Sequence, residues 1–191
     1  METNRKLLIL DLDETLIHAA EKPLARLPDF SVYNYYVYKR PNLDTFLLTC
    51  LDWFDVAVWT SSGAEYATQV VAAIFPDPQA LKFVWTSDRC SIVYNYHLDY
   101  IDGYYPQYYS RKPLKKVKRR GYDLEAVIAI DDTPKKWEKS YGNLIAVKPF
   151  EGDETDRELS HLLDYLDILK YERNIRKIEK RGWRDRVTNK E

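Results

Sequence analysis

Short, unbroken runs of apolar residues recur along the chain and are separated by segments of a different pattern. Such runs are typical of strands that are buried on both faces of a parallel sheet. The predicted strands are residues 7–10, 54–59, 83–86, 125–130 and 144–147. The intervening segments carry apolar positions at helical spacing or helix start and stop signals. The predicted helices cover residues 42–51, 64–75, 114–121 and 155–169.

Strands that alternate with helices predict an α/β fold of the Rossmann-like type, with three α/β/α layers around a central parallel sheet. A chain of 191 residues is expected to form one domain, residues 1–191. Within it we expect a β-rich insertion at about 90–110 and a charged C-terminal helix and tail at about 155–191. Thr155 to Glu158 resembles a helix-capping start, and the tail from Tyr171 is expected to extend that helix or to fray.

Two segments outside the predicted sheet are rich in tyrosine and other strand-forming residues. Residues 30–39 predict a short hairpin that would lie beside the site as a flap. The segment from Tyr94 to Tyr109 contains Asp102-Gly103, which is a hairpin-turn signal. This second hairpin is equally compatible with simple sheet packing and with a surface that binds a protein partner.

Composition and charge limit the binding partners and cellular compartments that the sequence favours. Lys and Arg number 29 against 30 Asp and Glu, so the net charge is −1 and no overall field favours nucleic acid or a membrane surface. No apolar run reaches the length of a transmembrane helix, and no secretory signal is expected. Cys50 and Cys90 match neither a metal-ligand spacing nor a disulfide framework. These features predict an intracellular protein, cytoplasmic, or nuclear if the organism is eukaryotic.

Carboxylates follow two of the predicted buried strands. Asp11 and Asp13 come at the end of the first, and Asp131 and Asp132 at the end of another. Open α/β sheets keep their sites at the carboxyl ends of strands. Close carboxylates repel one another, and a divalent cation such as Mg²⁺ removes that repulsion while leaving room for a phosphate. A lone Asp-x-Asp would more simply be a solvated acidic turn, but two such strands predict a site for Mg²⁺ and phosphoryl chemistry.

Two further features suit a phosphate ligand. The second predicted strand ends in Thr60-Ser61-Ser62-Gly63 before a helix, where hydroxyl and backbone N–H groups can face an anion. Because Ser and Thr cap helices in many proteins, this turn alone is a weak signal. Lys112 lies just ahead of a short helix and could point toward the site.

These motifs together resemble the haloacid dehalogenase superfamily. The resemblance is closest to its phosphatases of the RNA polymerase II carboxy-terminal domain, the small CTD phosphatase or NLI-interacting-factor-like branch. It rests on Asp11–His18, Lys39–Pro41, Val58–Ser62, Lys112 and Ile130–Pro134, which follow the family order. The resemblance covers roughly residues 6–170.

The resemblance implies roles for the acidic residues. Asp11 would be the nucleophile, forming an aspartyl-phosphate, and also a metal ligand. Asp13 would be the general acid and base and would bind Mg²⁺ through its backbone carbonyl, with Thr15 helping to position it. Asp132 would be a direct metal ligand, and Asp131 either a further ligand or a partner of the ligands.

The same resemblance assigns the phosphate-binding groups. Thr60 and the backbone of Ser61 would contact the phosphoryl group, and Lys112 would neutralise its charge and steady Asp11. Arg40, in the Lys39–Pro41 motif, is assigned to substrate binding.

The predicted function is Mg²⁺-dependent phosphomonoester hydrolysis, with a phosphopeptide or phosphoprotein carrying phospho-Ser, -Thr or -Tyr as substrate. A phosphatase for nucleic-acid 3′ ends or for a small metabolite is an alternative, supported by the basic run Lys115–Arg120. A binding module without turnover is another. The flap and the segment after the second motif depart from the family pattern, so the polymerase-tail substrate does not carry over with the catalytic residues.

Overall fold

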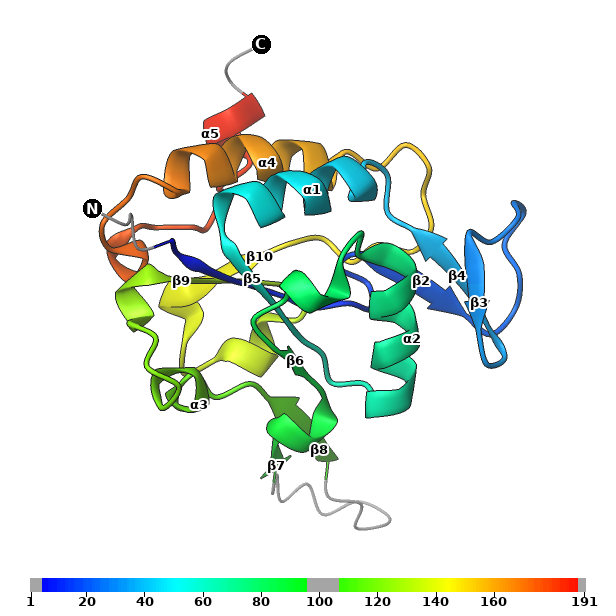
Figure 1. Cartoon of the computed structure of the whole chain (residues 1–191), viewed down its shortest axis with the longest axis horizontal. Coiled ribbons are helices and arrows are strands. Elements are labelled where there is room, and N and C mark those ends of the chain that lie inside the picture. Colours follow the sequence, from blue (N-terminus) through cyan, green and yellow to red (C-terminus); the bar gives the residue numbers. More distant parts are fainter. Residues whose placement is uncertain (1–4, 96–106, 189–191) are drawn as a thin grey trace, which may run out of the picture.

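The computed structural model describes residues 5–95 and 107–188. Its centre is a five-stranded sheet with the order β10-β9-β1-β5-β6, in which all neighbours are parallel (Figure 1). The strands are β1 (Leu7–Leu10), β5 (Asp55–Trp59), β6 (Val84–Trp85), β9 (Val127–Asp131) and β10 (Leu144–Ala146). The predicted α/β class and parallel sheet are therefore confirmed, and the first strand of the chain lies in the middle of the sheet.

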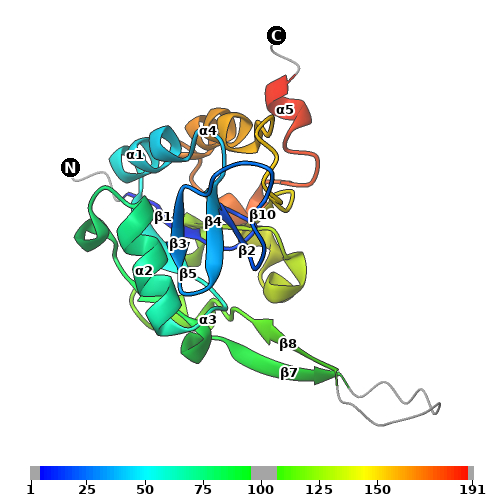
Figure 2. The same ribbon diagram turned by 90° about the vertical axis from the view of Figure 1, so that its right-hand side faces the viewer.

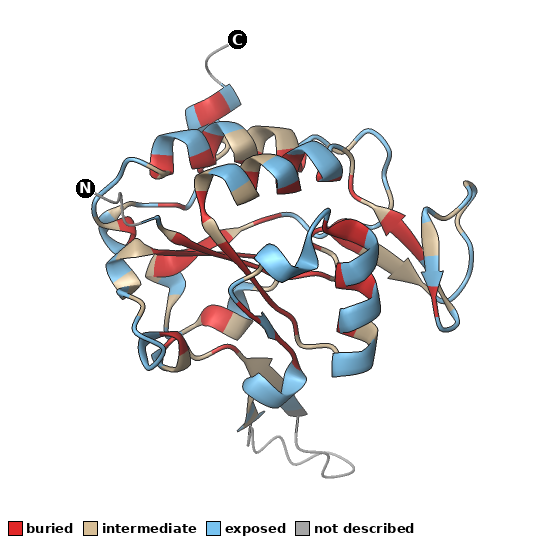
Figure 3. Cartoon of the chain, in the orientation of Figure 1, coloured by how far each residue is buried: buried red, intermediate tan, exposed pale blue. Residues whose placement is uncertain are grey.

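Helices cover both faces of this sheet. Side chains alternate along a strand, so Leu8 and Leu10 of β1 join one core and Leu7 and Ile9 join another. The first core includes α1 (Leu43–Trp53), α2 (Ala64–Ile74) and α4 (Glu158–Leu169), and the second includes α3 (Lys115–Lys118) and the 3₁₀ helix η4 (Pro134–Trp137). Figure 3 shows the buried residues along the strands and the inner sides of the helices.

Several short helices complete the connections between these elements. They are η1 (Pro78–Ala80), η2 (Ser87–Arg89), η3 (Leu124–Ala126), η5 (Tyr141–Asn143), η6 (Ile175–Lys177) and α5 (Asp185–Thr188). Within residues 5–95 and 107–188, none of the helices combines the length and the apolar character that crossing a membrane requires.

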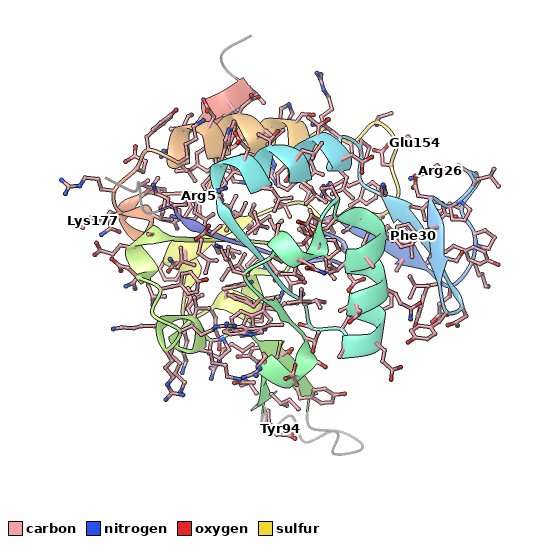
Figure 4. The ribbon with its side chains drawn as sticks, in the orientation of Figure 1. Arg5, Arg26, Phe30, Tyr94, Glu154 and Lys177 are labelled. Atoms are coloured by element: carbon pink, nitrogen blue, oxygen red, sulfur yellow. The ribbon has the colours of Figure 1, made fainter. Side chains whose placement is uncertain are left out.

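The predicted flap is larger than a two-stranded hairpin. β3 (Phe30–Val32) and β4 (Tyr35–Lys39) form the expected antiparallel pair, and β2 (Ile17–Ala20) adds a third strand on the other side of β4. Figure 2 shows this sheet facing the viewer. Arg26, in the loop before β3, lies 3.9 Å from Glu154 of the segment ahead of α4, through its Nε and the Glu Oε1 (Figure 4).

A second hairpin occupies the tyrosine-rich segment. β7 (Ser91–Asn95) pairs antiparallel with β8 (Gln107–Arg111), and Tyr94 lies opposite Tyr108 in the register. The pair extends away from the rest of the molecule (Figure 2). The turn predicted at Asp102-Gly103 lies outside the described residues.

The C-terminal segment differs from its prediction at both ends of α4. Instead of beginning at the Thr155 cap, the helix begins at Glu158, whose backbone N–H donates to the Asp156 carboxylate at 2.8 Å. After the helix the tail folds back on the domain. Trp183 is buried, and its Nε1 donates to the Ala146 carbonyl at 2.9 Å. A large aromatic ring in a charged segment therefore fixes a tail that was predicted to extend the helix or fray.

Lys180 in this tail predicts a pH effect on stability. It is only 6% exposed, its Nζ donates to the carbonyls of Ile175 and Ile178, and burial lowers its pKa to about 8. Between pH 8 and its ordinary value of 10.5 the unfolded chain binds the proton and the folded chain does not. Stability therefore rises with pH across that window, by at most about 1.4 kcal/mol per unit.

Urea unfolding of the wild type and of Lys180→Met across this window measures the effect. The free energy of unfolding of the wild type should increase relative to the variant as the pH rises. A difference between the two proteins that stays constant with pH would contradict the prediction.

Candidate active site

The carboxyl ends of three neighbouring strands bring the predicted residues together. Asp11 follows β1, Thr60 follows β5, and Asp131 ends β9 with Asp132 next to it. The ladder continues past β1, since the backbone N–H of Asp11 donates to the carbonyl of Ile130 at 3.0 Å. Because β1 lies between β5 and β9, its acidic end is flanked by the hydroxyl turn on one side and by the second acidic pair on the other.

Asp11 is a buried carboxylate with two ammonium partners. Its Oδ2 lies 3.0 Å from Nζ of Lys112 and 2.8 Å from Nζ of Lys136, and its Oδ1 accepts the N–H of Leu12 at 2.9 Å. Burial opposes ionisation, but the charges of the two lysines outweigh it and hold the pKa of Asp11 at about 2. The side chain is therefore ionised at neutral pH, as a nucleophile must be.

Asp131 holds the Lys112 ammonium in place through its carboxylate. Its Oδ2 accepts from Nζ of Lys112 at 2.5 Å and from Nε1 of Trp137 at 2.8 Å, and its Oδ1 accepts the N–H of Thr133 at 2.9 Å. Burial and the neighbouring charge of Asp11 raise the pKa of Asp131. Asp131 therefore holds Lys112 and Trp137 in place, and one of its oxygens also lies among those of Asp11 and Asp132.

Thr15 binds the second acidic pair instead of Asp13. Its Oγ1 accepts the N–H of Asp132 at 3.1 Å and lies 3.4 Å from Oδ1 of the same residue. The role predicted for Thr15, positioning Asp13, is therefore corrected: the hydroxyl fixes the loop after β9. The Thr133 hydroxyl donates to Oδ2 of Asp132 at 3.0 Å, and one carboxylate oxygen of Asp132 lies within 4.8 Å of one from Asp11.

The donor set suits a hard divalent cation. Asp11, Asp131 and Asp132 each offer one carboxylate oxygen, and these oxygens all lie within 4.8 Å of one another. All-oxygen sites with a small number of carboxylates are typical of Mg²⁺. Asp11, Asp131 and Asp132 are thus the residues that would hold the metal.

Hydroxyl groups from the turn after β5 and from α2 hold Asp13. Ser62 Oγ donates to its Oδ2 at 2.6 Å, and the Tyr66 hydroxyl donates to its Oδ1 at 2.6 Å. Thr60 Oγ1 lies 3.5 Å from Oδ2. Burial and the charge of Asp13 raise the pKa of Tyr66, so Tyr66 stays a donor. Asp13 is therefore fixed in place by neutral donors on the side opposite the lysines.

The turn predicted to bind phosphate follows β5. Thr60 is buried, and its Oγ1 accepts the N–H of Ser62 at 3.0 Å. The Ser61 hydroxyl faces Cys90 Sγ at 3.9 Å instead of the carboxylates, which leaves its backbone as the group available to an anion. α2 begins at Ala64, directly behind this turn.

Arg40 does not reach the carboxylates. Its guanidinium donates to Asp156 at 2.9 and 2.7 Å, to the carbonyl of Thr15 at 3.0 Å and to that of Lys148 at 2.9 Å. The structure therefore gives Arg40 a structural role in place of the predicted substrate contact, because a buried guanidinium must satisfy its donors within the protein. It ties the loop after β1 to the segment before α4.

Replacing Arg40 by Ala is expected to lower the free energy of unfolding by about 3–5 kcal/mol, because the Asp156 charge and two carbonyls lose their partner. The Michaelis constant of the folded fraction should stay unchanged. Denaturant unfolding and steady-state kinetics measure the two effects. Lys39→Ala is the control, since its ion pair with Asp44 is exposed and should contribute less than about 1 kcal/mol. A raised Michaelis constant at normal stability would restore the substrate-binding role.

Four contributors were not among the predicted site residues: Ser62, Tyr66, Lys136 and Trp137. Ser62 lies in the turn that was singled out, and Tyr66 follows it on the next helical turn, so spacing could have indicated both. Lys136 and Trp137 come within six residues of Asp131, but only the path of η4 turns them back toward β1.

The chain matches known proteins along most of its length. The model of the NLI interacting factor-like phosphatase family matches residues 6–176. The chain is similar to CTD small phosphatase-like protein 2 of Dictyostelium discoideum, with 31% identity over 88% of this chain and 28% of that protein. It is also similar to CTD nuclear envelope phosphatase 1B of Danio rerio, with 29% identity over 93% of this chain and 72% of that one. The chain thus spans only part of these relatives.

The fold is shared with a solved structure. The fission yeast RNA polymerase II CTD phosphatase Fcp1 bound to beryllium fluoride superposes with a TM-score of 0.56 at 19% identity, over 97% of this chain and 62% of that one. At this identity the likeness concerns the fold alone. Since the family model spans most of the chain, including both acidic strand ends, this protein belongs to the NLI interacting factor-like phosphatase family.

Proposed function

We propose that this chain hydrolyses phosphomonoesters with Mg²⁺ through an aspartyl-phosphate on Asp11. The observation that carries the proposal is the state of Asp11: a buried carboxylate that Lys112 and Lys136 hold ionised, at the end of β1 and close to Asp131 and Asp132 at the end of β9. Such a group can attack phosphorus, which splits hydrolysis into two easier displacements. Bound Mg²⁺ would supply positive charge to the phosphoryl oxygens and to the carboxylates.

The protein groups divide the remaining work. Asp11 forms the O–P bond while the bond from phosphorus to the leaving oxygen breaks. In its protonated form Asp13 gives a proton to that oxygen, and the resulting carboxylate takes a proton from the water that cleaves the aspartyl-phosphate, which restores the ionised Asp11 and the protonated Asp13. Lys112 offsets the charge that Asp11 and the phosphoryl oxygens share, and Thr60 with the Ser61 backbone offers donors to the same oxygens.

A phosphoprotein is the proposed substrate class. The relatives named above are phosphatases, and their names refer to a CTD. The insertions in the described part of this chain are small: a three-stranded sheet and a two-stranded hairpin. Neither has the size of a domain that would enclose a small metabolite. Tyr94 and Tyr108, 51% and 70% exposed on the hairpin, support a protein-binding role for the segment Tyr94–Tyr109. The free cysteines Cys50 and Cys90 support an intracellular setting.

The deciding experiment is hydrolysis of p-nitrophenyl phosphate with Mg²⁺ and with a chelator. Turnover that disappears with the chelator and returns with Mg²⁺ is the expected result. A panel of phosphopeptides, 3′-phosphorylated oligonucleotides and sugar phosphates then identifies the substrate class. Faster turnover of oligonucleotides or sugar phosphates than of every phosphopeptide would overturn the phosphoprotein assignment, and a folded protein with no turnover of any substrate would overturn the enzyme.

A further inference from the structure

Lys136 lies among the same carboxylates that make up the candidate metal site. Its Nζ is 2.8 Å from Oδ2 of Asp11, 3.4 Å from Oδ1 of Asp131 and 3.9 Å from Oδ1 of Asp132. These three residues are the ones whose oxygens lie within 4.8 Å of one another. One ammonium group therefore contacts every member of the set that suits Mg²⁺.

We propose that the Lys136 ammonium is an internal counter-ion of this site, which must leave the carboxylates before Mg²⁺ binds and so weakens the affinity of the site for the metal. The inference rests on the proposed function, because it takes the acidic cluster to be the metal site. Two cations cannot share the same carboxylate oxygens without repulsion, which at these distances is strong for a divalent ion.

The two lysines of the site differ in their freedom to move. Lys112 has a fully buried side chain that is fixed between Asp11 and Asp131, with the Trp137 ring 5.7 Å from its Nζ. The Lys136 side chain is 18% exposed. A lysine stem is flexible and its ammonium is strongly hydrated, so a partly exposed lysine can withdraw toward water where an enclosed one cannot. Lys136 is therefore the cation that exchanges, and Lys112 is the one that stays.

Backbone hydrogen bonds keep Lys136 close to the carboxylates. The Lys136 carbonyl accepts the N–H of Lys112 at 2.8 Å, and the Lys136 N–H donates to the Thr133 carbonyl at 3.1 Å. Its Cα position is thus tied to both neighbouring motifs while its side chain reaches across to β1. When the metal leaves, the ammonium can return and keep the acidic cluster neutralised.

Mg²⁺ binding measured by titration calorimetry, without substrate, tests this exchange in the full chain. Lys136→Met should bind Mg²⁺ about tenfold or more tightly than the wild type, because the competing charge is gone. Lys136→Arg keeps the charge and should bind no more tightly than the wild type. Lys135→Met is the matched control: its side chain is 57% exposed and pairs with Glu138, so it should stay within about twofold of the wild type.

Lys136→Gln provides a second neutral variant if the methionine variant does not fold in the absence of metal. An affinity of the neutral variants that equals or falls below that of the wild type would overturn the inference. The result is separate from the proposed function. Tighter Mg²⁺ binding by the neutral variants, with no phosphatase turnover by the wild type, would support the counter-ion and reject the proposed enzyme. Turnover by the wild type, with the same Mg²⁺ affinity in the neutral variants, would support the enzyme and reject the counter-ion.

Discussion

Asp11→Asn is expected to reduce the turnover number for p-nitrophenyl phosphate by a factor on the order of 10⁴ or more, while the folded structure persists. The amide has the shape of the carboxylate but cannot attack phosphorus. Loss of the carboxylate also removes the negative charge that lies 3.0 Å from Nζ of Lys112 and 2.8 Å from Nζ of Lys136. Steady-state kinetics with saturating Mg²⁺ measures the effect, and near-ultraviolet circular dichroism checks the fold.

Asp52→Asn is the matched control for this variant. Asp52 is an exposed residue on α1, and its replacement makes the same chemical change away from the site, so full activity is expected. Residual activity of Asp11→Asn within about tenfold of the wild type would rule out Asp11 as the nucleophile. Another carboxylate of the cluster would then have to carry the phosphoryl group.

Asp13→Asn is expected to separate the two half-reactions. Without the general acid, a phosphoserine peptide should react about 10²–10⁴-fold more slowly, since an alkoxide is a poor leaving group. p-Nitrophenol leaves without a proton, so the first displacement should survive with that substrate. The second displacement needs the base, so the phosphoryl-enzyme should accumulate. Rapid mixing should therefore show a burst of about one p-nitrophenol per enzyme, followed by a slow phase.

Tyr66→Phe is the companion to this variant, because it removes the hydroxyl that donates to Asp13 at 2.6 Å and leaves the ring in place. It should slow the reaction of the phosphoserine peptide and the second displacement by a smaller factor, about tenfold, because the hydroxyl only positions Asp13. An equal loss on both substrates, with no burst from Asp13→Asn, would mean that Asp13 is not the acid and base.

The sheet and its acidic ends could be predicted from sequence because they depend on short-range patterns. Buried runs such as Leu7–Leu10 identify the strands, and parallel pairing then brings the residues after them to one edge of the sheet. These two patterns are enough to predict that Asp11 and Asp132 lie at this edge. The placement of Thr60 followed in the same way from the end of β5.

Side chains whose role depends on an irregular turn were not predictable in that way. Lys136 looks like any exposed lysine until η4 turns it back toward β1, and its neighbour Lys135 points to Glu138 instead. Arg40 was assigned by motif, but its pairing with Asp156 joins segments that are 116 residues apart. Thr15 was misassigned for the same reason: its partner comes from the loop after β9, which is distant in sequence and near in space.

The central place of β1 also determines when the candidate active site can first assemble during synthesis. β1 is the first strand of this sheet to leave the ribosome, but its neighbour β9 ends only at Asp131, and Lys136 follows it. A nascent chain shorter than this exposes β1 with one side unpaired, and its Asp11 lacks Lys136 and the second acidic pair. Since long-range pairing of this kind folds slowly, partial chains are expected to depend on chaperones and to be catalytically silent.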